Sequence, residues 1–414
     1  MRGVTDLSGC RFCGRPLTLT LVNLGSTPLA NSYMDPAARD STEASYPLHA
    51  RVCESCYLVQ VDDVVTPEAI FNDYAYFSSY SESWLSHAKA FAEETVKRRG
   101  LGSQSLVLEV ASNDGYLLRE FAALGIPTLG VEPAANVAEV STSLGIETIV
   151  EFFGSDLARS LAADGRLADV VAANNVVAHV PDLNDFVEGL RLVLKPEGVV
   201  SIEVPHLLRL LEQVAFDTIY HEHFSYFSFS TLKMVLARHG LAAFDVEEPA
   251  SHGGSLRVWA AHESAGALVR ERVQAMEQLE GRAGLATAKP YQEFTTRVER
   301  CRDDFLSFLA SSRSSGRSVV AYGAAAKGNT FLNYCEVTVE QLDYVVDRSP
   351  HKQGMLLPGS RLPIFAPSHV EETEPDYLLI LPWNLRREIS AQMSSIARWG
   401  GRFVTAIPSV EVFG

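Results

Sequence analysis

Short apolar runs alternate with stretches of helical spacing through the middle of the chain. Five of these runs predict strands, at residues 105–111, 128–132, 147–152, 168–172 and 199–204. Between them, apolar residues recur at helical spacing, as around Leu118 and Leu190, and the second of these helices is expected to end near residues 196–198. Such alternation indicates an α/β fold with a parallel sheet covered on both faces. Two later runs, 241–246 and 255–261, predict an antiparallel pair at one sheet edge.

The rest of the chain divides into two further parts. Residues 1–70 are rich in turns and hold four of the six cysteines. After a polar helical stretch at 264–312, the strand–helix alternation returns on a smaller scale, with strands predicted at 318–322, 342–346, 377–381 and 402–407. The pattern therefore predicts three domains, at 1–70, 71–262 and 263–414, the last with a helical start.

Composition and charge narrow the class of protein. Hydrophobic residues make up 47% and charged residues 21% of the 414, an ordinary globular balance. The net charge of -16 disfavours nucleic acid as a partner, because an acidic surface repels phosphate backbones. No apolar run is long enough to span a membrane, and residues 1–9 lack the apolar core of a signal peptide. We therefore expect a cytoplasmic protein with no membrane partner.

Four cysteines form two CxxC pairs. Cys10 and Cys13 are one pair, and Cys53 and Cys56 are the other. In a reducing compartment, paired cysteines are more typical of metal sites than of disulfides. Four thiolates are a tetrahedral set that zinc prefers, and they leave no position open for water. The spacing predicts a structural zinc ion, and the alternative is four unrelated thiols.

The first strand of the central region leads into a loop suited to a nucleotide cofactor. Residues 106–115 read LVLEVASNDG, where small residues let a ligand approach the backbone. Glu132 ends the next strand, where a carboxylate can accept hydrogen bonds from ribose hydroxyls. Non-glycine residues stand at two positions where methyltransferases usually have glycine, and GxGxxG is absent. The order Glu109, Gly115, Glu132 still fits a variant methyltransferase loop, with a generic nucleotide-binding unit as the alternative.

A segment rich in histidine follows the fifth central strand. Residues 220–228 read YHEHFSYFS, and His179 follows the fourth strand. A histidine titrating near neutrality can remove a proton, and a neighbouring glutamate or tyrosine can orient it. Three alternatives stay open: His221 and His223 could bind a metal with His179, they could be hydrogen-bonded core residues, or the aromatic residues could simply be core.

The C-terminal region has a loop of its own after a strand, YGAAAKGNT at residues 322–330. Its small residues, the start of a helix and Lys327 would suit a pyrophosphate group. The loop is not a Walker A motif, and a tight packing turn is the alternative.

Taken in order, these motifs resemble the S-adenosylmethionine (SAM)-dependent sugar C-methyltransferases of deoxysugar biosynthesis, in particular C-3′-methyltransferases of nitrosugar (tetronitrose-type) pathways. The resemblance covers nearly the whole chain. The matching motifs are CxxC…CxxC, YAYFSSY at 74–80, EVASNDG at 109–115, NVVAHVP at 175–181, YHEHF at 220–224, HGGSLR at 252–257 and YGAAAKGN at 322–329.

The resemblance implies an N-terminal zinc domain, a central class I (Rossmann-like) methyltransferase domain and a C-terminal Rossmann-like domain that binds the nucleotide sugar. It implies SAM as cofactor. The residues that would bind SAM are Glu109, Ala111, Asn113, Gly115, Glu132, Pro133, Asn174, Asn175, Tyr80 and Ser81.

The substrate implied by the resemblance is a dTDP-linked 3-amino-4-keto-2,3,6-trideoxyhexose, methylated at C-3′ through an enolate by a monomeric enzyme. His223 would be the base, with Tyr220 and Glu222 orienting it or polarising the ketone. Tyr74, Tyr76 and His179 would contribute nearby. The residues that would bind substrate are Tyr322, Gly323, Lys327, Asn329, His221 and Arg257, although Arg257 could instead only support the fold.

Three other functions are compatible with parts of the pattern. An O- or N-methyltransferase would keep SAM without needing a carbon acid. A zinc-ribbon protein with a degenerate Rossmann domain would bind no SAM. A nicotinamide oxidoreductase would use the C-terminal domain, but the loop at Tyr322 lacks GxGxxG.

Overall fold

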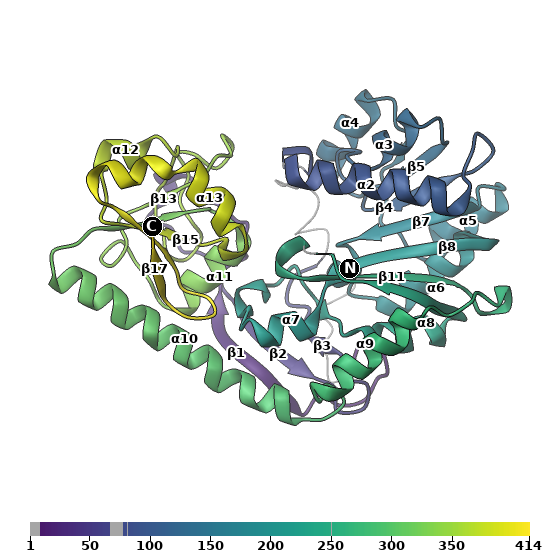
Figure 1. Ribbon diagram of the computed structural model, residues 1–414, viewed down its shortest axis with the longest axis horizontal. Coiled ribbons are helices and arrows are strands. Elements are labelled where there is room, and N and C mark those ends of the chain that lie inside the picture. The colour runs from purple at the N-terminus through teal and green to yellow at the C-terminus, as the bar shows by residue number, and fades with distance from the viewer. Residues whose placement is uncertain (1–8, 67–77, 81, 250) are drawn as a thin grey trace.

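The computed structural model describes residues 9–66, 78–80, 82–249 and 251–414, and Figure 1 shows them arranged around three sheets. In the view of Figure 1, the C-terminal domain lies to the left, the central domain to the right, and the N-terminal strands below and between them. Within these residues, no helix combines the length and apolar character that a bilayer crossing requires.

The central sheet has seven strands in the order β10-β11-β8-β7-β4-β5-β6. Its inner strands pair in parallel, whereas β11 runs antiparallel to both β8 and β10, which confirms the predicted edge pair. The bounds are β4 Val107–Val110, β5 Thr128–Val131, β6 Thr148–Ile149, β7 Ala168–Asn174, β8 Leu194–Pro205, β10 Leu241–Glu247 and β11 Ser255–His262.

Helices cover both faces of this sheet, and its inner strands are therefore buried on both sides. Two separate apolar clusters form, one with α2 and α3 and the other with α5, α6 and α8. The helices are α2 Glu82–Arg99, α3 Leu118–Ala123, α4 Ala135–Ser143, α5 Ser155–Ala163, α6 Leu183–Val193, α7 Leu207–Glu212, α8 Phe229–Arg238 and α9 Glu271–Arg282.

The end of α6 differs from its expected position. The helix ends at Val193 and β8 begins at once with Leu194, so Pro196 and Gly198 lie inside a long strand. The register of β7 and β8 shifts between the pairs Ala168–Leu194 and Val170–Val199, and this irregularity accommodates the proline.

The N-terminal strands form a four-stranded sheet in the order β1-β2-β3-β9. Three strands come from the cysteine-rich region: β1 Leu19–Thr27, β2 Tyr46–Val52 and β3 Val59–Gln60. The fourth, β9 Ser225–Tyr226, comes from the histidine-rich segment of the central domain. The N-terminal module is therefore continuous with the part of the chain that carries the candidate base.

The C-terminal sheet has the order β14-β13-β12-β15-β16-β17 and is parallel except for β17. Each of the four predicted strands contains one strand of this sheet, while β14 and β17 were not predicted. The bounds are β12 Val319–Tyr322, β13 Val345–Val346, β14 Ile364–Phe365, β15 Tyr377–Ile380, β16 Arg402–Thr405, β17 Glu411–Phe413, α10 Lys289–Ser314, α11 Ala326–Tyr334, α12 His369–Thr373 and α13 Arg386–Gln392. The fold class is thus the predicted one, with a cysteine-rich module and two α/β domains.

The long helix α10 connects these parts. It buries apolar residues at helical spacing, including Tyr291, Phe294, Val298 and Phe305, and packs against β1. Figure 1 shows it running beneath the C-terminal domain towards the base of the molecule. The stretch predicted as one polar helical segment forms two helices, α9 and α10. The first of them, α9, packs against β10 and α8.

Candidate active site

The loop after β4 turns sharply at three residues with left-handed backbone conformations. These are Ala111 (φ 56°), Asn113 (φ 50°) and Gly115 (φ 77°). A Cβ atom at Gly115 would lie 2.8 Å from the Oγ atom of Ser141, so glycine is required there. Asparagine tolerates this conformation, but alanine adopts it rarely. Ala111 and Asn113 nevertheless adopt the left-handed conformation that glycine residues usually supply in such a loop. Glu109 precedes the loop near the end of β4, and burial raises its pKa well above the usual value.

A carboxylate stands beside this loop at the end of β5. The Oε2 atom of Glu132 accepts a hydrogen bond from the Asn113 backbone N–H, and its Oε1 atom accepts one from the Ala134 N–H, both at 2.9 Å. Burial raises the pKa of Glu132, and the two N–H donors oppose that shift. Its position is therefore fixed by the backbone, as a ligand-binding carboxylate requires.

One cleft of about 770 Å³ joins this loop to the histidine-rich segment and to the C-terminal domain. Cofactor residues predicted from sequence that line it are Ala111, Asn113, Glu132, Pro133, Asn174 and Asn175. The lining also includes Tyr220, Glu222, His223 and His179 of the central domain and Lys327 of the C-terminal domain. The structure thus brings predicted catalytic, cofactor and substrate residues into one space.

His223 is held in one tautomer by its neighbours. Its Nδ1 atom lies 2.9 Å from the Thr218 carbonyl oxygen, which can only accept, so Nδ1 carries the proton. Nε2 is then the acceptor, and the Tyr220 hydroxyl donates to it at 2.8 Å. The basic lone pair of His223 is therefore directed at Tyr220, and both side chains line the cleft.

Two further titratable groups adjoin His223. The rings of His179 and His223 are 4.7 Å apart, and burial lowers the pKa of His179 to about 4, so that His179 is neutral at pH 7. Burial raises the pKa of Glu222 to about 7, against the opposing hydrogen bond from Asn31. The site therefore presents a neutral imidazole and a carboxyl group that still holds a proton near neutrality.

Lys327 is the cation on the C-terminal side of the cleft. It lies half-buried near the start of α11, and desolvation lowers its pKa while the nearby Asp217 opposes the shift. Asp217 in turn accepts a hydrogen bond at 2.9 Å from the Trp383 indole N–H. The positive charge of Lys327 is therefore partly balanced by the Asp217 carboxylate before any anionic ligand binds.

Several predicted substrate residues lie away from the cleft lining. His221 turns towards the N-terminal module and donates from Nε2 to the Pro47 carbonyl oxygen at 3.1 Å. Arg257 pairs with Glu203 at 2.6 Å and stacks over the Phe91 ring. Both side chains therefore hold elements together.

The other predicted residues of the C-terminal loop also have structural contacts. The Tyr322 hydroxyl donates to Gln392 at 3.2 Å. A Cβ atom at Gly323 would meet the Pro382 ring at 2.5 Å. The Asn329 amide donates to the Ala30 carbonyl oxygen at 3.3 Å. Of the predicted substrate residues, Lys327 is the one that lines the cleft.

Four predicted residues precede α2. Tyr74, Tyr76 and Ser81 lie outside the described residues. Tyr80 ends a short 3-10 helix, Ser78–Tyr80, whose first backbone N–H donates to the Asn113 side chain at 2.9 Å. That helix is therefore placed over the loop after β4.

Sequence reasoning missed part of the cleft wall. Residues that line the cleft without having been predicted include Asn31, Tyr33, Trp84, Phe152, Phe153, Lys352, Asn384 and Leu385. Lys352 is half-buried beside Tyr33 and donates to the Ala324 carbonyl oxygen at 2.8 Å. It follows a two-residue strand in a turn-rich stretch, and no local pattern singles it out.

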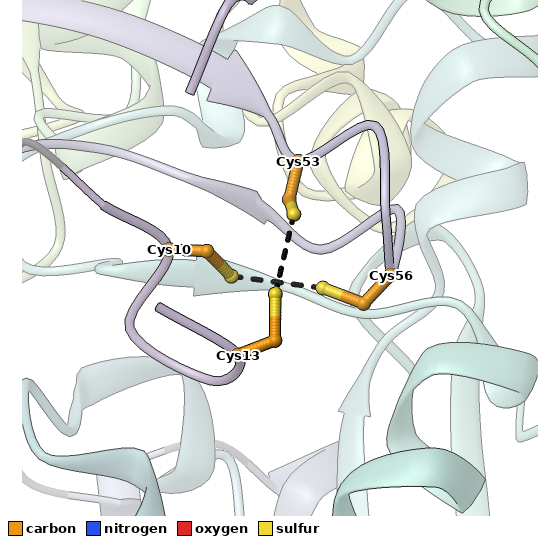
Figure 2. A group of neighbouring side chains, drawn as sticks. All are labelled: Cys10, Cys13, Cys53 and Cys56. Atoms are coloured by element: carbon orange, nitrogen blue, oxygen red, sulfur yellow. Dashed lines mark hydrogen bonds between the residues drawn. The ribbon is translucent and has the colours of Figure 1, made fainter. Parts of the chain in front are cut away.

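The four paired cysteines converge on one point, as Figure 2 shows. Their sulfur atoms lie within 4.8 Å of one another, with Cys10 and Cys56 3.6 Å apart and Cys13 and Cys53 3.5 Å apart. Zn–S bonds of about 2.3 Å in a tetrahedron would separate the sulfurs by roughly 3.8 Å. The residues therefore fit a zinc ion with four protein ligands.

Comparison with known proteins assigns each part of the chain. Residues 10–71 match a zinc-binding domain model, residues 84–246 a methyltransferase domain, and residues 250–408 a C-methyltransferase C-terminal domain. The C-methyltransferase NovU of Streptomyces niveus is 36% identical over 409 residues, which cover 99% of this chain and 97% of that protein. The chain belongs to this C-methyltransferase family.

More distant similarities concern the central domain. The ubiquinone biosynthesis O-methyltransferase of Chelativorans sp. is 29% identical over 97 residues, 23% of this chain and 38% of that protein. The solved structure of magnesium protoporphyrin IX methyltransferase from Synechocystis with bound S-adenosylhomocysteine has a TM-score of 0.35 at 12% identity, over 43% of this chain and 82% of that one. Neither of these is needed for the assignment.

The C-methyltransferase is therefore a SAM-dependent transferase with a zinc-binding module. Membership of a family of C-methyltransferases excludes the alternatives of an O- or N-methyltransferase, a non-enzymatic zinc ribbon and an oxidoreductase. The site fits SAM because a fixed carboxylate, Glu132, stands beside a loop whose backbone is open to a ligand, at the carboxyl ends of parallel strands.

Proposed function

We propose that this C-methyltransferase methylates C-3′ of a dTDP-linked 3-amino-4-keto-2,3,6-trideoxyhexose, acting as a single chain. One observation carries the proposal. A single cleft is lined by the Glu132 carboxylate, by His223 and Glu222, and by the half-buried cations Lys327 and Lys352 of the C-terminal domain. A cofactor with ribose hydroxyls, a carbon acid and a diphosphate fit these three regions in that order.

A ketone at C4 of the sugar makes the C3 proton acidic, so the protein needs a base and a group that stabilises the enolate oxygen. SAM, when bound, supplies the electrophilic methyl group. Alignment of the sugar with that methyl group is the remaining task of the cleft.

His223 is the proposed base, and Nε2 is the atom that takes the proton, because Nδ1 keeps its own in the bond to Thr218. Nε2 accepts the Tyr220 hydroxyl in this structure. A sugar that brings C3 to Nε2 displaces this hydroxyl, which is then free to donate to the ketone oxygen.

Glu222 is the proposed acid. Its pKa of about 7 leaves about half of the buried carboxyl groups protonated and able to donate a hydrogen bond at pH 7, and most of them below that pH. A neutral acid stabilises an enolate oxygen, whereas a carboxylate would repel it. Glu222 and Tyr220 would therefore share the oxygen while His223 holds the C3 proton.

The proposed diphosphate site rests on two half-buried lysines. Lys327 and Lys352 reach the cleft from α11 and from the loop after β13. Desolvated cations gain from an anionic ligand more than solvated ones do. The predicted Tyr322, Gly323 and Asn329 would support this region through the fold.

The proposal is tested by incubating the enzyme with SAM and the dTDP-amino keto sugar in deuterated water, with mass spectrometry and NMR of the sugar. A quaternary carbon at C3 carrying a new methyl group is the expected product. Exchange of the C3 proton for deuterium without transfer would support the base and contradict the choice of sugar. Neither exchange nor transfer would contradict both.

A further inference from the structure

A short loop of the N-terminal module lies where the three parts of the molecule meet. It covers residues 30–33, after β1. The Ala30 carbonyl oxygen accepts a hydrogen bond from Asn329 at 3.3 Å, and the Tyr33 hydroxyl donates to the Ala324 carbonyl oxygen at 2.6 Å. The loop is therefore anchored on the C-terminal domain at both ends.

Between these anchors, Asn31 faces the central domain. Its Nδ2 atom donates to the Oε1 atom of Glu222 at 2.7 Å, across 191 positions of sequence. Asn31 and Glu222 both line the cleft. The zinc-binding module thus contributes a polar side chain at the centre of the site.

Glu222 depends on this contact. Its side chain is 4% exposed, and among the described residues Asn31 supplies the hydrogen bond to its carboxyl group. A buried carboxyl group with one partner takes its orientation from that partner. Without Asn31, the Glu222 carboxyl would be free to turn about its side-chain torsions.

We propose that Asn31 is a positioning residue for methyl transfer, which fixes the orientation of the Glu222 carboxyl group towards the reacting sugar. The mechanistic part of this inference rests on the role proposed above for Glu222. The contact itself does not depend on the identity of the sugar.

Other charged or titratable groups surround the same carboxyl. Tyr33 faces it from the N-terminal loop, and the buried ring of His179 lies against its backbone. Tyr220 and His223 lie on the same segment as Glu222. Lys327 and Lys352 line the cleft from the C-terminal domain. The Tyr33 hydroxyl lies 3.4 Å from the Asn31 Oδ1 atom but keeps its shorter bond of 2.6 Å to Ala324 in an Asn31 variant, so a change in the titration of Glu222 reports on the Asn31 contact.

The test compares Asn31→Leu and Asn31→Asp with the native enzyme. Leucine keeps the size but removes the donor that favours the carboxylate, and aspartate adds a repelling carboxylate. We expect the pH midpoint of Glu222 to rise by about one unit in Asn31→Leu and by more in Asn31→Asp. The midpoint is read from the carboxylic acid band in an infrared pH titration, assigned by subtraction of the Glu222→Gln spectrum.

Asn23→Ala is the matched control, because Asn23 is an exposed asparagine on β1 of the same module. It should leave the midpoint and the turnover unchanged. In Asn31→Leu, kcat should fall about tenfold, and the alkaline limb of the pH profile should move to higher pH. The affinity for SAM, measured by calorimetry, should be unchanged.

Two results would overturn the inference. An unchanged Glu222 midpoint in both Asn31 variants would show that the amide does not control the carboxyl. A fall in kcat accompanied by lower SAM affinity and an unmoved pH profile would assign Asn31 a structural role only. The infrared titration needs no sugar, so a wrong substrate in the proposed function would leave its outcome readable.

Discussion

At the scale of the residue, the motif YHEHF separates into different roles according to what each side chain meets. His221 and His223 are two positions apart, yet His221 meets a carbonyl oxygen of the N-terminal module and His223 meets the cleft. Glu222, between them, keeps its proton to about pH 7 because it is buried. The surroundings of each side chain therefore distinguish the proposed base, His223, and the proposed acid, Glu222, from His221, which has a structural contact.

Replacing His223 tests the base directly. His223→Gln should lower kcat by roughly 10²–10⁴-fold and abolish C3 proton exchange, because Nε2 of His223 is the atom proposed to take the C3 proton. His221→Gln is the matched control. It should lower thermal stability, through loss of the bond to Pro47, and leave the turnover of the folded enzyme near the native value. Equal losses of turnover in the two variants would contradict the assignment.

The proposed acid predicts a pH dependence. Glu222 donates only when protonated, and its protonated fraction falls as pH rises through about 7. The kcat measured with both substrates saturating should therefore decline on the alkaline side of pH 7. Glu222→Gln should remove this limb, since an amide keeps its donor at every pH. A persisting limb in that variant would assign the titration to another group.

At the scale of the element, the antiparallel pairing of β8 with β11 carries a buried ion pair. Glu203 and Arg257 face each other across the two strands and make a contact at 2.6 Å. Burial acts to raise the pKa of Glu203, but His87 and Arg257 outweigh it and bring the pKa to about 2. The stability that this carboxylate contributes is present above its unfolded pKa and is lost as pH falls from about 4 towards 2.

Arg257→Met separates a structural role for Arg257 from substrate binding. Removing the guanidinium takes away one partner of a buried carboxylate that keeps His87 at 3.0 Å, which should cost about 3 kcal/mol of unfolding free energy. Urea denaturation measures this loss, and Arg257→Met combined with Glu203→Gln should recover part of it. The KM for the nucleotide sugar should not change in the folded fraction. A higher KM at native stability would instead place Arg257 in the substrate site.

At the scale of the whole molecule, the zinc-binding module is built into the catalytic domain. Arg11, between two ligand cysteines, donates to the Pro181 carbonyl oxygen at 3.1 Å, and Pro181 lines the cleft. The Cys56 carbonyl oxygen accepts from Thr231 at 3.0 Å. With the β3–β9 pairing, these contacts make the zinc site a support for the wall of the active site.

Loss of the metal should therefore reach the active site. Cys53→Ser should lower bound zinc from one ion per chain, reduce the unfolding temperature by roughly 10 °C, and reduce turnover. Elemental analysis and thermal denaturation measure the first two. Cys301→Ser is the control, because Cys301 is a buried thiol on α10 remote from the four ligands. Full activity in a zinc-free enzyme would contradict the coupling.

The sequence by itself determined the features that depend on local pattern. Alternating apolar runs predicted both parallel sheets, because a strand buried on two faces and an amphipathic helix leave different periods in the chain. The CxxC pairs predicted the sulfur cluster, since each pair is a local turn that needs only its partner. Strands β1, β2 and β3 lie in a region read only as rich in turns, and they were not predicted. The short strands β9, β14 and β17 have too few residues to show a period, and they were not predicted either.

Only the tertiary structure decided which side chains share the cleft. Asn31 meets Glu222 across 191 positions, and Lys352 joins Lys327 there from a stretch with no motif. His221 and Arg257, singled out by motif, are turned to structural partners instead. A local pattern specifies the conformation of a segment, but its neighbours are set by how separate segments pack, and packing between distant segments leaves no period or spacing in the chain.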